Sequence, residues 1–150
     1  MVKIVHGDLL KSDAEYICHQ VNCQGVMGSG VAKQIKKEWP AVFNSYQALC
    51  NAKAADRSSL IGTVQTVKVN ETKAVCNIFG QINYGRDGQC YTDILALKRA
   101  FEEIAANASI CVRIAMPYRI GCGLGGGDWG VVMDMLADIF KNHSLTLYRL

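Results

Sequence analysis

The chain has 150 residues, of which half are apolar and 19% are charged, and its formal net charge is +3. This length accommodates one domain with an apolar core, and the balance of residue types is that of a water-soluble globular protein. No apolar run approaches the eighteen or so residues of a membrane span, and the N-terminal alternation lacks the long apolar segment of a signal peptide. We therefore expect a single domain over residues 1–150, located in the cytoplasm, monomeric and without a membrane partner.

Seven cysteines form no CxxC pair, and the three histidines are scattered along the chain. Structural zinc sites need closely spaced ligand pairs, and disulfide frameworks are rare in the cytosol. The sequence therefore predicts no metal, no cofactor and no disulfide. Cys18, Cys76 and Cys111 lie in apolar, strand-like runs, where we expect them to pack as small hydrophobic residues.

One basic cluster stands out in an otherwise even distribution of charge: Lys33, Lys36 and Lys37. It has two interpretations, a solvated helix face or a patch that binds nucleic acid. Basic and aromatic residues are nowhere interleaved along the sequence as in single-strand binders, so the solvated face is favoured. A mildly positive surface would still help to attract a small anionic ligand.

Six segments rich in Val, Ile, Tyr, Thr or Cys are predicted to form strands. They are Val2–His6, Tyr16–Val21, Gly62–Val69, Ala74–Phe79, Ser109–Met116 and Ser144–Arg149. The residues Asn70-Glu71-Thr72 between the third and the fourth segment are typical of a hairpin turn.

Four segments between these strands show helical periodicity or helix signals. The clearest is Asp93–Asn107, with apolar residues at spacings of three and four. Asp128 is well placed to cap a second helix, Val31–Trp39 indicates a third, and Pro40 opens a fourth. Helices that alternate with strands around a hairpin predict an α/β fold of three layers, with a central mixed sheet of about six strands. Ligands of such sheets bind at the carboxyl ends of the strands.

Two glycine-rich loops each follow a predicted strand and precede a predicted helix. The first, Gly25–Val31, has three glycines within six residues, and the second, Ile120–Gly127, has five within seven. Glycine lets the backbone approach a ligand with its N–H groups free, and a helix N-terminus favours anions. A tight strand-to-helix turn is the alternative. Neither loop matches a P-loop or a clean GxGxxG motif, so these features alone indicate a phosphate or nucleotide binder.

Further motifs make the chain resemble the macrodomain family. They are Gly7-Asp8-Leu9-Leu10, Cys18-His19-Gln20-Val21-Asn22-Cys23, Met27-Gly28-Ser29-Gly30-Val31-Ala32, and Met116-Pro117 followed by Ile120-Gly121-Cys122-Gly123-Leu124. Over essentially its whole length the chain is similar to the branch that contains the terminal ADP-ribose protein glycohydrolase and the yeast ADP-ribose-1″-phosphate phosphatase. The resemblance implies that the partner is ADP-ribose or an ADP-ribosylated substrate, and that nucleic acid takes part only as such a substrate.

The resemblance also implies roles for single residues. Asp8 would accept a hydrogen bond from the adenine amino group, although a turn cap before Leu9 is the alternative. Asn22 would lie near the distal ribose, although it also fits a turn asparagine. Tyr148 and Leu150 would lie beside the adenine, or simply form an edge strand. The other implied ligand-binding residues are Leu9, Gly28, Ser29, Gly30, Val31, Ile120, Gly121, Cys122, Gly123, Leu124 and Gly125.

The chain departs from the family at two positions that matter for catalysis. Where the glycohydrolase resembled here has a nucleophilic lysine and an aspartate, this sequence has Gln81 and Gly125. An amide nitrogen is not nucleophilic and glycine offers no acid or base, which argues against a Lys–Asp mechanism. His19 matches a histidine of phosphatase-like members and, with Asn22, is a candidate catalytic residue, but His19 equally fits a hydrogen-bonded core residue.

The other reactive side chains near the loops have structural interpretations. Cys122 has no partner base in view, Asp128 fits a helix cap, and Asp93 fits the first turn of a helix. Three functions therefore remain: a hydrolase acting on ADP-ribose-1″-phosphate or an ADP-ribosyl adduct, a non-catalytic ADP-ribose reader, and a generic nucleotide- or phosphate-binding module. The sequence favours ADP-ribose binding, and hydrolysis slightly over passive reading.

Overall fold

The structure, a computed structural model, describes residues 2–150. Its strands are β1 (Val2–His6), β2 (Tyr16–Asn22), β3 (Val64–Lys68), β4 (Ala74–Gln81), β5 (Arg113–Pro117) and β6 (Ser144–Arg149). Its helices are α1 (Gly30–Glu38), α2 (Pro40–Ala52), α3 (Ile94–Asn107) and α4 (Trp129–Ile139), with 3-10 turns at Leu9–Lys11 and Arg57–Leu60.

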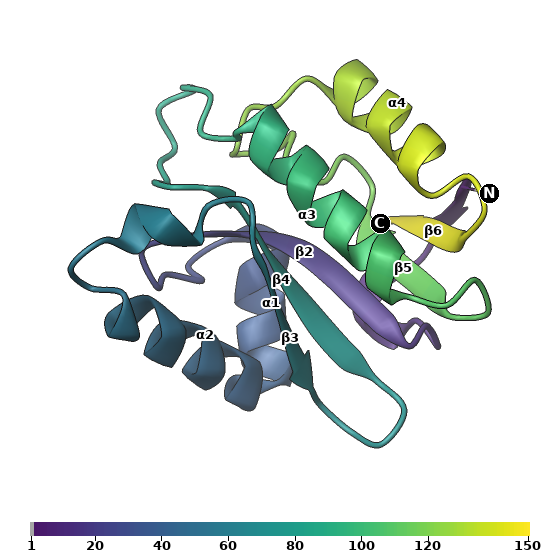
Figure 1. Cartoon of the computed structure of the whole chain (residues 1–150), viewed down its shortest axis with the longest axis horizontal. Helices are drawn as coiled ribbons and strands as arrows, with labels where there is room; N and C mark the ends of the chain where they lie inside the picture. Colours follow the sequence, from purple (N-terminus) through teal and green to yellow (C-terminus); the bar gives the residue numbers. More distant parts are fainter. Residues whose placement is uncertain (1) are drawn as a thin grey trace.

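The six strands form one mixed sheet between two layers of helices (Figure 1). The strand order is β1-β6-β5-β2-β4-β3, and β3 is antiparallel to β4 while the other pairs are parallel. Helices α3 and α4 cover one face of the sheet, and α1 and α2 cover the other. The predicted three-layer α/β fold is confirmed, including its mixed sheet, its hairpin and its six strands.

Each layer of helices buries its own apolar cluster against the sheet. Leu97, Phe101 and Leu136 belong to the cluster under α3 and α4, and Tyr46 and Phe79 belong to the one under α1 and α2. Strand β4 is buried at every position except its last residue, as expected for a strand with helices on both faces. These two cores hold the carboxyl ends of the strands in fixed positions.

Strands β2 and β5 pair only at their amino ends. Tyr16 is opposite Ile114 and Ile17 is opposite Ala115, and no further pair follows in this direction. The chain also reverses its direction across the sheet here, because after β2 it continues to β3 and β4 on one side, and after β5 it continues to β6 on the other. A crevice at such a reversal, at the carboxyl ends of parallel strands, is the common ligand site of open α/β sheets.

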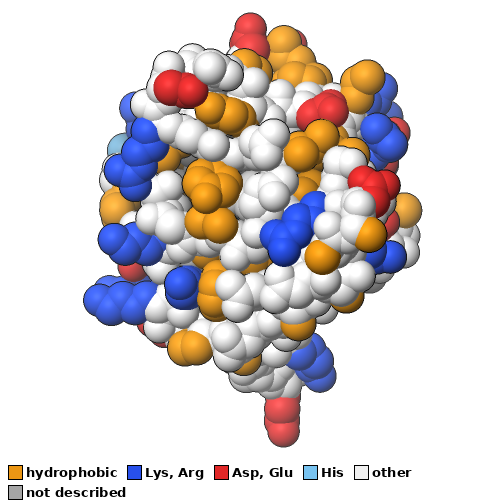
Figure 2. All heavy atoms as spheres, turned by 90° about the vertical axis from the view of Figure 1, so that its left-hand side faces the viewer, with side chains coloured by type: hydrophobic (Ala, Val, Ile, Leu, Met, Phe, Trp, Pro, Cys, Tyr) orange, Lys and Arg blue, Asp and Glu red, His pale blue; other side chains and the backbone are white. Residues whose placement is uncertain are grey.

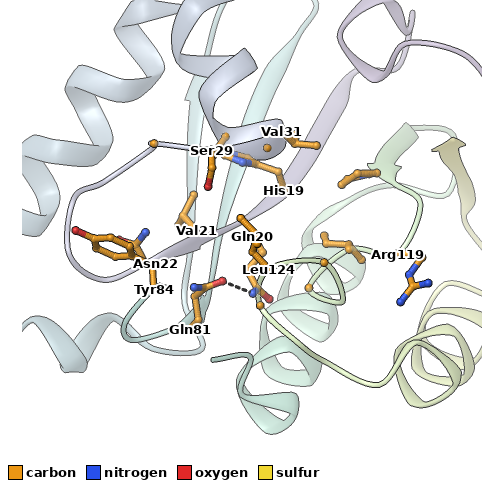
Figure 3. A pocket seen from close by; sticks show the side chains of 18 of the residues that line it. His19, Gln20, Val21, Asn22, Ser29, Val31, Gln81, Tyr84, Arg119 and Leu124 are labelled. Atoms are coloured by element: carbon orange, nitrogen blue, oxygen red, sulfur yellow. Dashed lines mark hydrogen bonds between the residues drawn. The ribbon is translucent and has the colours of Figure 1, made fainter. Parts of the chain in front are cut away.

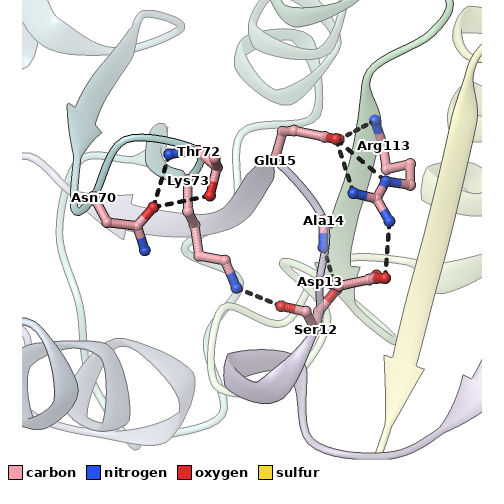
Figure 4. Close-up of polar contacts among 8 residues, drawn as sticks. All are labelled: Ser12, Asp13, Ala14, Glu15, Asn70, Thr72, Lys73 and Arg113. Carbon is pink, nitrogen blue, oxygen red and sulfur yellow. Dashed lines mark hydrogen bonds and ion pairs between the residues drawn. The ribbon is translucent and has the colours of Figure 1, made fainter.

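Polar contacts tie the opposite, amino ends of the same strands together (Figure 4). The Arg113 guanidinium lies 2.8 Å from Asp13 and 2.9 Å from Glu15, and its backbone N–H also donates to Glu15 at 2.6 Å. The hydrogen bonds from Arg113 lower the pKa of the Glu15 carboxyl. The ammonium group of Lys73 donates to the carbonyl oxygen of Ser12. These contacts close the sheet at the end that is remote from the crevice.

Several details of the sequence prediction were wrong. Strand β5 begins at Arg113 rather than at Ser109, because the Ser109 hydroxyl and carbonyl oxygens accept the N–H groups of Cys111 and Val112 in a turn. Cys111 is therefore exposed and does not act as a core residue. The strand expected from Gly62 begins only at Val64, because Gly62 has a φ of +82°.

Asp93 was also placed slightly wrongly: it is not a first-turn residue but the N-cap of α3, and its Oδ1 accepts from the Ala96 N–H at 3.0 Å. Asp128 caps α4 as predicted, and Pro40 opens α2 as predicted. No helix within residues 2–150 is both long and apolar enough to cross a bilayer.

Candidate functional site

A cavity of about 460 Å³ lies at the carboxyl ends of β2, β4 and β5, where β2 and β5 separate. Figure 3 shows its side chains, with Asn22 and Tyr84 on one side and Arg119 on the other. The lining residues are His19, Gln20, Val21, Asn22, Val26, Gly28, Ser29, Gly30, Val31, Ala32, Gln81, Tyr84, Gly85, Arg86, Pro117, Tyr118, Arg119, Ile120, Gly121, Gly123, Leu124 and Gly125. Both predicted glycine loops therefore meet at one cavity.

The first glycine loop is held by the side chain of Asn22. Its Oδ1 accepts from the Gln24 N–H at 2.9 Å, and its Nδ2 donates to the Val26 carbonyl at 2.8 Å. The hydroxyl of Tyr46 donates to the backbone and side-chain oxygens of Asn22 at 2.7 and 2.8 Å, and burial raises the pKa of that hydroxyl. Asn22 therefore organises the loop as a turn asparagine does, and it also lines the cavity.

Helix α1 presents its N-terminus to the cavity. Ser29 is the N-cap but its side chain caps no backbone N–H, and Gly30 enters the helix with a φ of +60°. The first N–H groups of a helix have no partner inside the helix and carry partial positive charge. Gly30, Val31 and Ala32 line the cavity, so this end of α1 is suited to an anion such as a phosphate.

The second glycine loop is packed against residues 91 and 92. The Gly125 carbonyl accepts the N–H groups of Tyr91 and Thr92 at 2.7 and 2.9 Å, and the Gly121 carbonyl accepts from the Thr92 hydroxyl at 2.6 Å. A Cβ added at Gly125 would lie 2.9 Å from the Gly121 carbonyl, whereas nothing lies within 4 Å of one added at Gly123. Several of these glycines are therefore required by internal packing, a reason that the sequence did not reveal.

The floor of the cavity is a network of amides and hydroxyls. The Nε2 of Gln20 donates to Gln81 Oε1 at 2.6 Å and to Thr92 Oγ1 at 2.9 Å, and Gln81 Nε2 donates to the Asn83 carbonyl at 2.7 Å. The two positions where the sequence lacks the lysine and the aspartate, Gln81 and Gly125, both border this network. The network contains no ionisable group, and its one hydroxyl, that of Thr92, donates to the Gly121 carbonyl.

His19 is buried, with 1% of its surface exposed, and lines the cavity. A series of hydrogen bonds fixes the tautomer of the His19 ring. The Ser45 carbonyl accepts from Gln65 Nε2 at 3.1 Å, Gln65 Oε1 accepts from Asn77 Nδ2 at 3.0 Å, and Asn77 Oδ1 lies 2.6 Å from His19 Nε2. Since Asn77 Oδ1 can only accept, Nε2 carries the proton and Nδ1 has a free lone pair.

The environment keeps this imidazole neutral. Burial lowers the pKa of His19 to about 4, against the opposing effect of the hydrogen bond to Asn77. Nδ1 is buried and has no protein partner among the described residues. A buried acceptor without a partner, in a residue that borders a cavity, is a position where a water molecule or a ligand hydroxyl group would complete the hydrogen bonding.

The remaining predicted site residues lie outside the cavity lining. Asp8 caps the 3-10 turn after β1, with its Oδ1 accepting the Leu10 N–H at 3.0 Å, and Leu9 is buried. Tyr148 is half-buried in β6, and Leu150 is 93% exposed. The Cys122 thiol is buried, donates to the Ile120 carbonyl at 3.4 Å, and has a pKa raised by burial, so it is no activated thiolate.

Several residues that line or support the cavity were not predicted as site residues, among them Gln20, Tyr84, Arg86, Thr92 and Arg119. Gln20 is a polar residue inside a buried strand motif, which is a signal that could have identified it. The segment 82–92 has no periodicity, so nothing marked Tyr84 and Arg86.

The charge of the lining is positive. Arg86 and Arg119 line the cavity, and none of its described lining residues carries a carboxylate. Within residues 2–150, no cluster of three or more His, Cys, Asp or Glu side chains could hold a metal ion. The arrangement is therefore suited to an anion bound by backbone amides and arginines.

Residues 18–136 match the family model of the Macro domain. The chain belongs to the macrodomain family. It is 29% identical over 144 residues to the DNA ADP-ribosyl glycohydrolase of Mycobacterium tuberculosis, covering 94% of this chain but 39% of that protein. It is 31% identical over 100 residues to the ADP-ribose 1″-phosphate phosphatase of Meyerozyma guilliermondii, covering 65% of this chain and 53% of that protein.

Among solved structures, the macrodomain of Mycobacterium tuberculosis DarG superposes with a TM-score of 0.79 and is 26% identical, covering 100% of this chain and 98% of that chain. The resemblance noted from the sequence motifs is thus confirmed at the level of family and fold. This macrodomain spans well under two thirds of the glycohydrolase and the phosphatase that it matches.

Proposed function

We propose that this macrodomain binds ADP-ribose between its two glycine loops and hydrolyses the bond at C1″ of the distal ribose in an ADP-ribose derivative. The observation that carries the proposal is a carboxylate-free cavity into which the N-terminus of α1 opens and which is lined by His19, whose buried Nδ1 has no protein partner among the described residues. The names of the two sequence relatives, which refer to ADP-ribosyl DNA and to ADP-ribose 1″-phosphate, support it.

In this proposal the diphosphate lies against the backbone amides of Gly30 and Val31, with the second glycine loop on its other side. The distal ribose lies near Asn22, and the adenine extends toward Asp8. The Oδ1 of Asp8 accepts a hydrogen bond from the Leu10 N–H, and Oδ2 is therefore left to accept one from the adenine amino group. Tyr148, which lies beside Gly7, would flank the adenine together with Leu9 and Leu150.

The chemistry cannot use a lysine adduct, because Gln81 occupies that position. We propose instead that a water molecule donates a hydrogen bond to His19 Nδ1 and attacks C1″. The water oxygen bonds to C1″, the bond from C1″ to the leaving group breaks, and the proton passes to Nδ1 and then to the leaving group. With a pKa of about 4, His19 is a weak base, but its protonated form is a strong acid toward the leaving group.

Two measurements test binding and turnover separately. Calorimetry with ADP-ribose should give a binding isotherm. If no heat of binding is measured, the proposed function is wrong. Incubation with ADP-ribose-1″-phosphate should release phosphate, and incubation with an ADP-ribosylated peptide or oligonucleotide should release ADP-ribose. Replacing His19 with Gln, with binding retained, should lower turnover; undiminished turnover would exclude His19 from the reaction.

The second candidate is a reader that binds ADP-ribose without cleaving anything. It is favoured by one observation, the uncharged network around Gln81 and Gly125, in which there is neither a lysine nor an aspartate. A tight complex with ADP-ribose and no product from any of these substrates would establish the reader. Binding of AMP or inorganic phosphate as tightly as ADP-ribose would instead favour a generic nucleotide- or phosphate-binding module.

We also propose that the domain acts as a monomer in the cytoplasm. Its seven cysteines are free thiols, which suits a reducing compartment, and its exposed large apolar residues, such as Ile4, Leu95 and Ile110, belong to three different segments. Light scattering on the purified protein should give the mass of one chain, and a dimer mass would overturn this point.

A further inference from the structure

A second hollow lies between α1 and α2. It is lined by Met27, Gly28, Lys33, Lys36, Lys37, Pro40, Phe43 and Asn44, and we call it the lysine groove. Three of these side chains are cationic, and none of the described lining residues is acidic. The groove therefore concentrates as many positive charges as the formal net charge of the whole chain, which is +3.

The lysine groove combines charge with an aromatic ring. Lys33, Lys36 and Lys37 follow one another at spacings of three and one on α1, and the Lys36 ammonium lies 4.0 Å from the centre of the Phe43 ring of α2. Basic and aromatic residues are not interleaved along the sequence, but the packing of α1 against α2 brings them together. Lysines around an aromatic ring are the composition of surfaces that bind single-stranded nucleic acid.

The lysine groove adjoins the candidate site. Gly28 lines both the groove and the cavity, so the two hollows meet at the first glycine loop. Figure 2, which looks onto the left-hand side of Figure 1, shows Lys and Arg side chains gathered along the left margin of that face. A polyanion that is attached to a ligand in the cavity can therefore cross Gly28 and continue along a positive surface.

We propose that the lysine groove binds the backbone of a single nucleic acid strand whose ADP-ribosyl group occupies the cavity. This inference rests on the proposed function, because the groove receives the part of the substrate that lies beyond the distal ribose. The three lysines pair with consecutive phosphates, and the exposed Pro40 together with the partly buried Phe43 provides apolar surface for bases. A single strand fits better than a duplex, since a modified base stacked inside a duplex must first leave the stack to place its ADP-ribosyl group in the cavity.

The test compares two triple variants of equal charge. One is Lys33→Gln/Lys36→Gln/Lys37→Gln, and the control is Lys53→Gln/Lys68→Gln/Lys98→Gln, which changes exposed lysines that line neither hollow. Fluorescence anisotropy measures the binding of an oligothymidylate of about twelve nucleotides, within the site sizes of single-strand binders. The oligothymidylate is used unmodified and with one ADP-ribosyl group, and calorimetry measures the binding of free ADP-ribose.

The groove variant should bind the modified strand about tenfold more weakly than the native protein, and the slope of log affinity against log salt should fall by about two, at roughly 0.7 per phosphate. The control variant should behave like the native protein, and both should bind free ADP-ribose normally. If both variants lose the same affinity for the modified strand, the overall charge of the protein, and not the groove, explains the binding. If neither variant loses affinity, the groove is not the binding surface. Equal or tighter binding of duplex DNA, or of a poly-glutamate peptide of the same charge, would also overturn the proposal.

The two proposals fail in different ways. If native protein binds unmodified oligothymidylate with a salt slope that depends on the three lysines but does not bind ADP-ribose, the groove stands as a nucleic acid surface and the proposed function falls. If ADP-ribose binds and the groove variant binds the modified strand as the native protein does, the proposed function stands and the groove is excluded.

Discussion

The carbonyl oxygen of Gly125 accepts the N–H of Thr92 at 2.9 Å, and a side chain at position 125 would collide with the Thr92 hydroxyl. This contact ties the second glycine loop to the segment that follows β4. It also explains in physical terms why this chain has no aspartate at position 125: the space that a carboxylate would need is filled by Thr92, Gln20 and the Gly121 carbonyl.

Gly125→Asp should therefore destabilise the protein without creating a catalytic acid. We expect the free energy of unfolding to fall by about 2 kcal/mol or more, because an added side chain overpacks the loop. Urea denaturation measures this. The matched control is Gly123→Asp, which adds the same side chain where nothing lies within 4 Å, and it should unfold like the native protein. Equal stability of the two variants would contradict the packing of this loop.

His19 should make stability depend on pH in a defined window. Its pKa is about 4 in the folded protein against an ordinary value of 6.5, so between these values the unfolded chain binds a proton that the folded chain does not. Stability should therefore fall as the pH drops from about 6.5 to about 4, by roughly 3 kcal/mol at most. Urea titrations between pH 7 and about pH 4.5 measure the effect.

The control for this prediction is His19→Gln, which removes the titrating group while His6 and His143 remain. The variant should lose the part of the pH dependence that falls in this window. If both proteins lose stability to the same extent between about pH 6.5 and pH 4.5, the imidazole of His19 is not held neutral by burial.

Much of the fold followed from local sequence signals. The cap at Asp128, the opening of α2 at Pro40 and the hairpin before β4 depend on neighbouring residues, and these predictions were confirmed. The false strand start at Ser109 arose because Ile110 and Cys111 look like strand residues, while the side chain and carbonyl of Ser109 close a turn. Local propensity does not reveal such competition for backbone hydrogen bonds.

The candidate site was predictable only in part. Two glycine loops after strands indicated where an anion would bind, because the carboxyl ends of parallel strands meet at one edge. The network from Gln81 through Gln20 to Thr92 joins residues that are 61 and 72 positions apart. Such contacts depend on the register of β2 against β4 and on the path of an aperiodic loop, and neither has a local signature.

Asn22 should prove more important for ligand binding than for stability alone. Asn22→Ala removes the bonds to Gln24 and Val26 that hold the first glycine loop, so we expect ADP-ribose affinity to fall about tenfold or more, together with a loss of roughly 2 kcal/mol in stability. Calorimetry and urea denaturation measure the two effects.

Tyr46→Phe serves as the comparison for Asn22→Ala. It removes a buried hydroxyl that donates to Asn22, but it leaves the Asn22 side chain in place. We expect a loss of about 1–2 kcal/mol in stability and only a small change in ADP-ribose affinity. If the two variants weaken binding equally, Asn22 acts through loop stability and makes no contact of its own with the ligand.

Asp8→Asn separates the two roles that Asp8 can have. The amide keeps an Oδ1 acceptor for the Leu10 N–H, so the cap and the stability should be preserved, but the carboxylate that would accept the adenine amino group is lost. We expect ADP-ribose affinity to fall about tenfold, as for a hydrogen bond to a charged group, while affinity for ribose 5-phosphate, which has no adenine, stays unchanged. Asp8→Ala should add a stability loss of about 1 kcal/mol from the missing cap. If Asp8→Asn binds ADP-ribose as the native protein does, Asp8 is a turn cap only and the adenine is recognised elsewhere.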